Sequence, residues 1–275
     1  MHVAHDSLAL PGAHLDLARM PGHWLLARLG KRVLRPGGIE LTRQMLDALA
    51  ITSDDDVVEL APGLGATTRL TLARQPASYV GIERDEAAAA QVRRLLHRPE
   101  HRCLHGTAAA TGLDSASASV VYGEAMLTMH TAAQKEAIVR EAFRVLAPGG
   151  RYGVHELGLH PDGVSAAVKE EVMRDLSSAI RVGARPLCAG EWRRVLEGAG
   201  FEVEMEASAP MHLLELGRLV RDEGVIGTLR IFGNVALKPV ARRRVLEMQS
   251  AFRKHRQVLC AVALVARKPA AIQPG

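Results

Sequence analysis

The sequence predicts an α/β fold organised around a doubly wound, mostly parallel sheet of seven strands. From residue 55 onward, short apolar runs alternate with helical patterns at the spacing of βα units. The first run, at about 56–60, carries an acid near its end and leads into a Pro-Gly-x-Gly turn, and the second run, 79–83, also ends in an acid. Ligands of such sheets bind at the carboxyl ends of the strands, so these two loops define the predicted binding edge.

The elements follow from the periodicity of apolar residues in chain order. Residues 1–50 are predicted to be largely helical, with apolar residues at helical spacing at Trp24, Leu25, Leu26, Leu29 and Val33. Strands are predicted at 56–60, 79–83, 102–105, 118–123, 151–157, 201–206 and 258–266. Helices are predicted at 67–75, 85–97, 132–146 and 165–181, and a further helix is predicted to begin within 186–192 and to end at 198. The turn Pro148-Gly149-Gly150 is predicted to stop the helix before the fifth strand.

Composition limits the kinds of protein that this chain can be. A length of 275 residues suffices for one α/β domain with a helical annex, and with only 3% aromatic residues the core must be aliphatic. Cys103, Cys188 and Cys260 show no paired spacing, which indicates a reduced, cytoplasmic protein without disulfides or a metal site. Neither an export signal at 1–6 nor an apolar run long enough for a membrane span is expected.

The net charge of +5 arises largely from a late basic cluster. Its members are Lys238, Arg242, Arg243, Arg244, Arg253, Lys254 and Arg256. Such a cluster can contact a phosphate backbone. Because aromatic residues that stack on bases are scarce, the pattern favours a solvated helix face over a nucleic-acid site.

The loop after the first strand has the features of an anion and nucleotide site. Gly63 and Gly65 allow backbone conformations that are closed to other residues, and free amides at the start of the next helix favour an anion. Glu83, at the end of the second strand, is placed to accept hydrogen bonds from ribose hydroxyls. A nicotinamide dinucleotide fingerprint would need a small residue at Thr68, so the sequence disfavours that class of enzyme.

Together these motifs resemble the class I S-adenosylmethionine-dependent methyltransferases over roughly residues 35–205. The family loop reads acid-x-Gly-x-Gly-x-Gly, and here Ala61 stands at the first glycine, where alanine is tolerated if its φ is negative. The family often has Gly-Asp-Ala where this chain has Gly106-Thr107-Ala108, so the Ala108 amide is expected to contact adenine. The sequence is most similar to the small-molecule branch that includes the ubiquinone and menaquinone biosynthesis methyltransferases.

The resemblance implies a domain organisation and a cofactor. It implies a Rossmann-like core at 51–208, an N-terminal helical cap at 1–50, a helical insert at 209–256 and an antiparallel last strand with a tail at 257–275. The insert is expected to be a substrate lid or a dimer surface, so a homodimer stays open. The implied cofactor is S-adenosylmethionine, held without a metal by Thr42, Glu59, Ala61, Pro62, Gly63, Gly65, Thr67, Glu83, Arg84, Gly106, Thr107, Ala108 and Glu124.

Four residues near the expected carboxyl edge are candidates for catalysis. Glu124 and His130 follow the fourth strand, and His155 and Glu156 end the fifth. Because neighbouring strand residues point to opposite faces, at most one of His155 and Glu156 is expected to enter the pocket. The acceptor is expected to be a small apolar or amphipathic metabolite, with Met211, His212 and Phe232 as candidate lining residues.

Three other functions stay open at this point. An RNA methyltransferase would use the late basic cluster, although the Asn/Asp-Pro-Pro-aromatic motif of base N-methylation is absent after the fourth strand. A nicotinamide-dependent oxidoreductase is disfavoured by Thr68. A non-catalytic ligand-binding protein of the same fold is compatible with the departures from the family pattern at Ala61 and Thr107.

Overall fold

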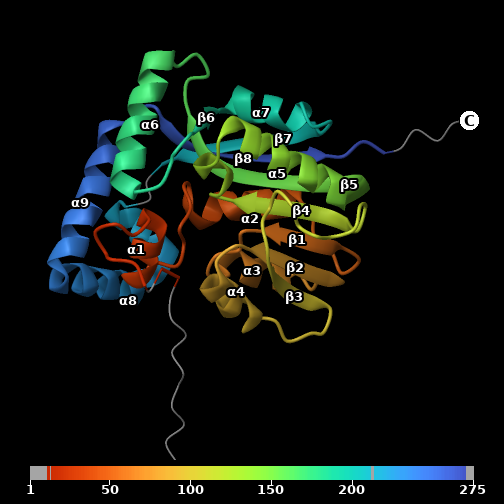
Figure 1. The fold of residues 1–275 in the computed structure, drawn as a ribbon, viewed down its shortest axis with the longest axis horizontal. Helices are drawn as coiled ribbons and strands as arrows, with labels where there is room; N and C mark the ends of the chain where they lie inside the picture. The colour runs from red at the N-terminus through yellow and green to blue at the C-terminus, as the bar shows by residue number, and fades with distance from the viewer. Residues whose placement is uncertain (1–10, 13, 212–213, 271–275) are drawn as a thin grey trace, which may run out of the picture.

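The computed structural model describes residues 11–12, 14–211 and 214–270 (Figure 1). The expectations for residues 1–6, for His212 and for the end of the tail at 271–275 lie outside the described residues. Within the part that is described, no helix combines the length and the hydropathy needed to cross a bilayer.

One sheet runs through the centre of the molecule in the order β3-β2-β1-β4-β5-β8-β7, with the short β6 paired to the end of β5. The strands are β1 Asp56–Leu60, β2 Ser78–Glu83, β3 His101–His105, β4 Ala118–Glu124, β5 Leu146–Leu159, β6 Leu187–Cys188, β7 Glu202–Pro210 and β8 Leu259–Arg267. Strands β1 to β6 pair in parallel, and β8 is antiparallel to both β5 and β7. The mostly parallel sheet with an antiparallel last strand is confirmed, and β6 is an eighth strand that the sequence did not predict.

Helices cover both faces of this sheet, which is why its central strands are apolar on both sides. Along the chain they are α1 Gly22–Arg28, α2 Gly38–Ala48, α3 Ala66–Leu72, α4 Glu86–Arg93, α5 Ala132–Val145, α6 Ala166–Ile180, α7 Ala189–Glu197, α8 Leu216–Leu237 and α9 Pro239–Lys254. Side chains of α5 and α7 pack on one face around Val121 and Tyr152, and those of α2 and α4 pack on the other around Val120 and Tyr122. The edge strand β7 instead alternates exposed and half-buried residues.

Two local predictions need correction. Val33 lies beyond the end of α1, in an extended connection, and is not part of a helix. The predicted turn at 147–150 lies within β5, where the pairing jumps from Ala118 opposite Leu146 to Val120 opposite Arg151. The glycines therefore form a bulge that takes up extra residues between helix and strand.

Helix α2, which was expected to belong to the N-terminal cap, packs on the sheet. Leu41, Met45 and Leu46 are fully buried against β4 and β8. The segment that leaves the core therefore ends before Gly38, so the cap and the core meet at the start of α2 and not near residue 50.

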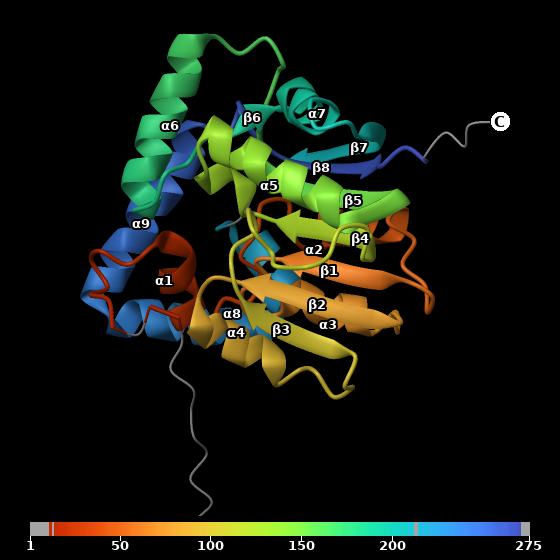
Figure 2. The same ribbon diagram turned by 45° about the vertical axis from the view of Figure 1, so that its right-hand side comes forward.

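Helices α1, α6, α8 and α9 gather at the end of the sheet toward which the parallel strands point (Figures 1 and 2). Met20, Leu25 and Leu29 from the N-terminal segment share one apolar cluster with Ala179 of α6 and Met248 of α9. The N-terminal segment and the late insert thus form a single helical annex beside the carboxyl ends of the strands.

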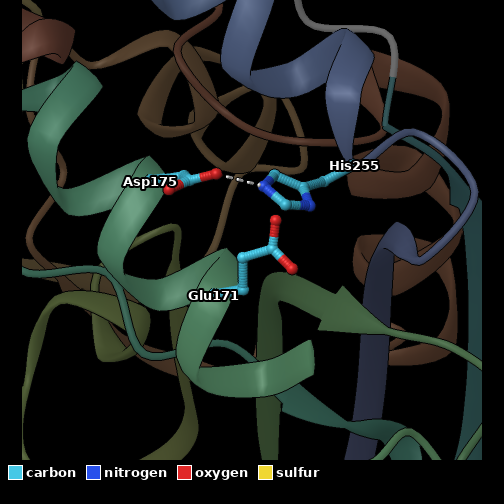
Figure 3. Close-up of side chains that lie close together, drawn as sticks. All are labelled: Glu171, Asp175 and His255. Atoms are coloured by element: carbon cyan, nitrogen blue, oxygen red, sulfur yellow. Dashed lines mark hydrogen bonds and ion pairs between the residues drawn. The ribbon is translucent and has the colours of Figure 1, made fainter. Parts of the chain in front are cut away.

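A polar cluster fastens α6 to the end of α9. Glu171 and Asp175 lie one helical turn apart on α6, and His255 faces them from the end of α9, with Nε2 2.9 Å from Asp175 Oδ2 (Figure 3). These residue types could bind a metal ion. The ammonium of Lys254, however, lies 2.7 Å from an oxygen of each acid and supplies the positive charge that a metal ion would bring. Its hydrogen bond, followed by that of His255, lowers the pKa of Asp175 to about 2.

The late basic cluster is only partly a solvated face. Arg244 is 1% exposed, and its guanidinium donates to the carbonyls of Leu17, Ala18, Met20 and Ala179. Arg244 therefore anchors the N-terminal segment to α6 and α9.

We expect Arg244→Met to lower the free energy of unfolding by about 2–4 kcal/mol, because it leaves several buried carbonyls without a donor. Urea denaturation followed by circular dichroism measures this change. Arg243→Met is the matched control, since Arg243 is exposed and forms a surface ion pair with Glu247 at 3.7 Å. Such pairs contribute little to stability. Equal stability of the two variants would contradict the anchoring role.

Candidate active site

The loop between β1 and α3 has the backbone conformation that a glycine-rich loop requires. Ala61, Gly63 and Gly65 have φ values of 55°, 58° and 73°. The expectation of a negative φ at Ala61 was therefore wrong, and this alanine adopts a left-handed conformation at a cost of about 1–2 kcal/mol. A Cβ atom at Gly65 would lie 2.5 Å from Leu95, whereas one at Gly63 would meet nothing within 4 Å. The space over Gly63 is open.

Glu83 holds this loop at the end of β2. Its Oε2 accepts from the Gly63 amide at 2.9 Å, and its Oε1 accepts from the Asp85 amide at 3.0 Å. The carboxyl is buried, and burial raises its pKa in spite of these hydrogen bonds. The Gly106 amide also donates to the backbone carbonyl of Glu83 at 2.9 Å. Three predicted cofactor-binding segments therefore converge on one residue.

The remaining predicted residues of these loops lie around the same point. Thr107 is exposed and Ala108 half-buried directly after Gly106. The Arg84 side chain is exposed, and its carbonyl lies 2.9 Å from His105 Nε2. Pro62 is buried, and its carbonyl accepts from the Gly65 amide at 3.0 Å.

Glu59 lies beneath the loop, and its side chain is buried. Its Oε2 accepts from the hydroxyls of Thr68 at 2.8 Å and Tyr79 at 2.6 Å. Burial raises its pKa to about 7, although both hydrogen bonds act in the other direction. We predicted direct cofactor contact for Glu59. In the structure its carboxyl instead ties α3 to β2.

Glu124, at the end of β4, is the centre of a second polar cluster. Its Oε2 pairs with Arg35 at 2.6 Å and accepts from the Thr67 hydroxyl. Its Oε1 accepts from Thr42 at 2.6 Å and lies 2.7 Å from His155 Nδ1. Burial opposes its ionisation, but the charge of Arg35 and the hydrogen bond from His155 hold its pKa at about 2. Glu124 is therefore an ionised carboxylate with every partner inside the protein.

His155 and Glu156 point to opposite faces of β5, as the strand geometry predicts. His155 Nδ1 lies 2.7 Å from Glu124, and Nε2 lies 2.7 Å from the Pro36 carbonyl, so the ring connects β4 with the strap. Glu156 accepts from the amides of residues 126, 127 and 128 and from the Thr128 hydroxyl. It orients the loop after β4 from the other side of the sheet.

His130 lies apart from both clusters. Its Nδ1 is 2.9 Å from the Met126 carbonyl, and α5 is capped by the next residue, Thr131, in a capping box with Gln134. His130 therefore closes the turn after β4.

The sequence analysis missed Arg35, which enters the site from the connection between α1 and α2. We call this connection, residues 29–37, the strap. Arg35 is 5% exposed, and only Nη1 is used, for Thr67 and Glu124. Its Nε and Nη2 are buried without a hydrogen-bond partner. A buried guanidinium with two free donors indicates that an anion belongs beside it.

Helix α8 clamps the strap from outside. Lys31 is fully buried with its ammonium 3.4 Å from Asp222 and 3.5 Å from Glu223. Glu223 also accepts from the amides of Arg32 and Val33 at 2.8 and 2.9 Å. Directly after Glu223 the helix breaks at Gly224, which has φ 73° and ψ 172°. These acids fix the strap over the carboxyl ends of the strands.

His23 of α1 is a further residue that the sequence analysis missed. Burial, followed by the charge of Arg84, lowers its pKa to about 4, so the ring is neutral near pH 7.

Two surface hollows lie at the opposite edge of the sheet. One is lined by Ser119, Gly150 and Arg151, and the other by Asp56 and Ser78, all near the amino ends of the strands. None of the predicted site residues lines either hollow. The predicted site and the two hollows therefore lie at opposite ends of the strands.

Comparison with known proteins gives a consistent result for the core. A family model described as a methyltransferase domain matches residues 57–150, which include both loops that meet at Glu83. An uncharacterised protein of Haemophilus influenzae is 30% identical over 252 residues, covering 90% of this chain and 98% of that protein.

Solved structures share the same architecture. The MccD protein matches with a TM-score of 0.67 and 17% identity over 85% of this chain and 99% of its own. The 4+2 cyclase SpnF matches with a TM-score of 0.68 and 17% identity over 90% and 93%. Phosphoethanolamine N-methyltransferase 2 of Haemonchus contortus, in complex with S-adenosyl-L-methionine, matches with a TM-score of 0.68 and 13% identity over 90% and 57%. At these identities the likeness shows the fold alone.

The raised pKa of Glu59 predicts a pH effect on stability. The unfolded carboxyl ionises near pH 4.3 and the folded one near 7, so the native state binds its proton more tightly. Stability is lost as the pH rises between these two values. Glu59→Gln keeps an oxygen acceptor without the charge, and we expect its stability relative to wild type to rise by up to about 3 kcal/mol from pH ~5 to pH ~8.

Urea denaturation at both pH values measures this difference. Glu170→Gln, at an exposed acid on α6, is the control and should show no such change. A difference for Glu59→Gln that does not depend on pH would show that the folded carboxyl ionises normally.

Proposed function

Because the chain belongs to the class I S-adenosylmethionine-dependent methyltransferases, we propose that it moves a methyl group to a small, apolar or amphipathic metabolite. The observation that carries the proposal is the junction of Gly63 and Glu83 at the carboxyl ends of β1 and β2, with open space over Gly63. S-adenosylmethionine is the cofactor, and when bound it supplies a methyl group already activated by the sulfonium.

The residues present fit this cofactor in three places. The carboxyl of Glu83 is placed to accept from the two ribose hydroxyls, and the amide of Ala108 follows Gly106 on the side where adenine would lie. The free Nε and Nη2 of Arg35 suit the carboxylate of the methionine part, because a guanidinium binds carboxylates in a bidentate manner.

The chain's own groups support transfer by positioning. With a pKa of about 2 the Glu124 carboxylate is a poor proton acceptor near neutral pH, and it already binds Arg35 and His155. We therefore propose Glu124 and His155 as positioning residues that hold the strap, and we do not propose His130 or Glu156 as catalytic. An in-line approach in a shielded site is sufficient for many acceptors, and a base is needed only where the acceptor loses a proton.

The composition of the insert supports an apolar or amphipathic acceptor, since residues 209–256 are rich in Leu, Val and Met. The RNA alternative loses support because Arg244 and Lys254 of the basic cluster are committed to internal contacts. We propose the cytoplasm as the location, because Cys103, Cys188 and Cys260 are all unpaired.

Glu83→Ala is expected to weaken binding of S-adenosylmethionine at least about tenfold, because two hydroxyls lose a charged acceptor. Glu83→Gln should lie between Glu83→Ala and wild type, since it can still accept from the Gly63 amide. Isothermal titration calorimetry measures these affinities. Glu86→Ala, at an exposed acid three residues later, is the matched control and should bind as wild type does. Equal affinity of Glu83→Ala and wild type would remove the ribose assignment.

The role of Arg35 is tested by a cofactor analogue that lacks only the carboxylate. Wild type is expected to bind S-adenosylmethionine about tenfold or more tightly than decarboxylated S-adenosylmethionine, because a charge-assisted pair is lost. Arg35→Gln should bind the two about equally, whatever its overall affinity. Arg32→Gln, at an exposed neighbour, should keep the wild-type preference. If Arg35→Gln kept the wild-type preference for S-adenosylmethionine over the decarboxylated form, Arg35 would not be the residue that binds the carboxylate.

A further inference from the structure

The second half of α8 carries an exposed apolar face. Within the described residues, every large apolar side chain that is exposed lies between Val220 and Leu246. Val225, Leu229 and Phe232 follow one another at helical spacing, and Ile226 and Leu237 lie beside them. We call this set, completed by Val240 at the start of α9, the insert face: Val225, Ile226, Leu229, Phe232, Leu237 and Val240.

This exposure is unusual for a solvated helix. Ile226 is 78% exposed and Leu237 81%, while Ile231 on the opposite side of the same helix is buried. The second half of the helix thus carries large apolar side chains on its exposed side as well as on its buried side, a pattern typical of a helix that is covered on both sides. A contiguous apolar patch of this kind marks an interaction surface.

The charges around the insert face select what covers it. Arg230, Lys238, Arg242 and Arg243 are exposed beside it. No Asp or Glu occurs between Gly224 and Leu246, and the next acid, Glu247, already pairs with Arg243 at 3.7 Å. A second copy in a two-fold contact would present the same cations against one another, with no acid from this stretch to pair them. The complementary surface is instead apolar and anionic.

From this combination we infer that the insert face binds the surface of an anionic phospholipid bilayer. A helix with exposed apolar side chains and flanking cations lies in the membrane interface, with the apolar groups among the acyl chains and the cations at the phosphates. Pro239 begins α9, so Leu237 and Val240 lie on either side of the junction between α8 and α9. The inference concerns binding only and holds whether or not a methyl group is transferred.

Flotation of the full chain with vesicles tests it. Wild type is expected to float with vesicles of phosphatidylcholine mixed with phosphatidylglycerol and to bind pure phosphatidylcholine at least about tenfold more weakly, with the difference shrinking as salt is added. The variant Ile226→Asn/Leu229→Gln/Leu237→Gln should lose binding to both. The variant Arg230→Gln/Arg242→Gln/Arg243→Gln should lose the preference for the anionic vesicles.

The variant Arg43→Gln/Arg102→Gln/Arg140→Gln is the matched control. It removes the same charge from exposed positions of the core and should float as wild type does. All substituted positions are exposed, and circular dichroism checks that each variant is folded. A second readout is Phe232→Trp, whose added fluorescence should shift to the blue with anionic vesicles.

Three results would overturn the inference. The first is an absence of flotation with the anionic vesicles. The second is equal flotation of wild type and the apolar variant. The third is a lipid-free dimer in light scattering that the apolar variant converts to a monomer, because the insert face would then be covered by a second copy.

Discussion

The site depends on one buried carboxylate. Glu124 is ionised and almost enclosed by protein, and such a charge is tolerated only when it is paired and fully hydrogen-bonded. Its partners come from four separate segments: Arg35 from the strap, Thr42 from α2, Thr67 from α3 and His155 from β5. Removing any one of them takes away either the counter-charge or a hydrogen bond of this carboxylate, so the strap, the glycine-rich loop and the sheet are fixed together. The strap in turn leaves two donors of Arg35 free, and this links the stability of the cluster to recognition of an anion.

Local patterns in the sequence were sufficient for the core. The apolar runs that end in Glu59, Glu83 and Glu124 gave strand ends within a residue or two, because a strand covered on both faces must be apolar throughout. The meeting of Gly63 and Glu83 followed from the rule that parallel strands end at a common edge. The conformation of Ala61 did not follow, because a positive φ is imposed by the loop and leaves no mark on the residue itself.

Contacts between distant segments could not be predicted. Lys31 and Asp222 are 191 residues apart, and nothing in either local pattern shows that they pair. The same holds for Arg244, which counted as a member of a basic face although it is buried under the carbonyls of the N-terminal segment. The internal partners of Glu59 could not be predicted for a related reason. The acid of the loop motif was assigned to the cofactor, and nothing in the sequence indicated that Tyr79 and Thr68 donate to it. A 4+2 cyclase shares this architecture, so the fold alone does not fix the reaction.

Helix α8 has two tasks, divided at Gly224. Before the glycine, Asp222 and Glu223 bind Lys31 and the strap amides, so this half belongs to the site. After it, Val225, Ile226, Leu229, Phe232 and Leu237 are exposed, so this half carries the surface. The backbone at Gly224 is non-helical, and this break lets the two halves take different directions. A partner that covers the second half of α8 therefore contacts the same helix that holds the strap through Asp222 and Glu223. Surface and site are therefore joined through one helix, with Gly224 between them.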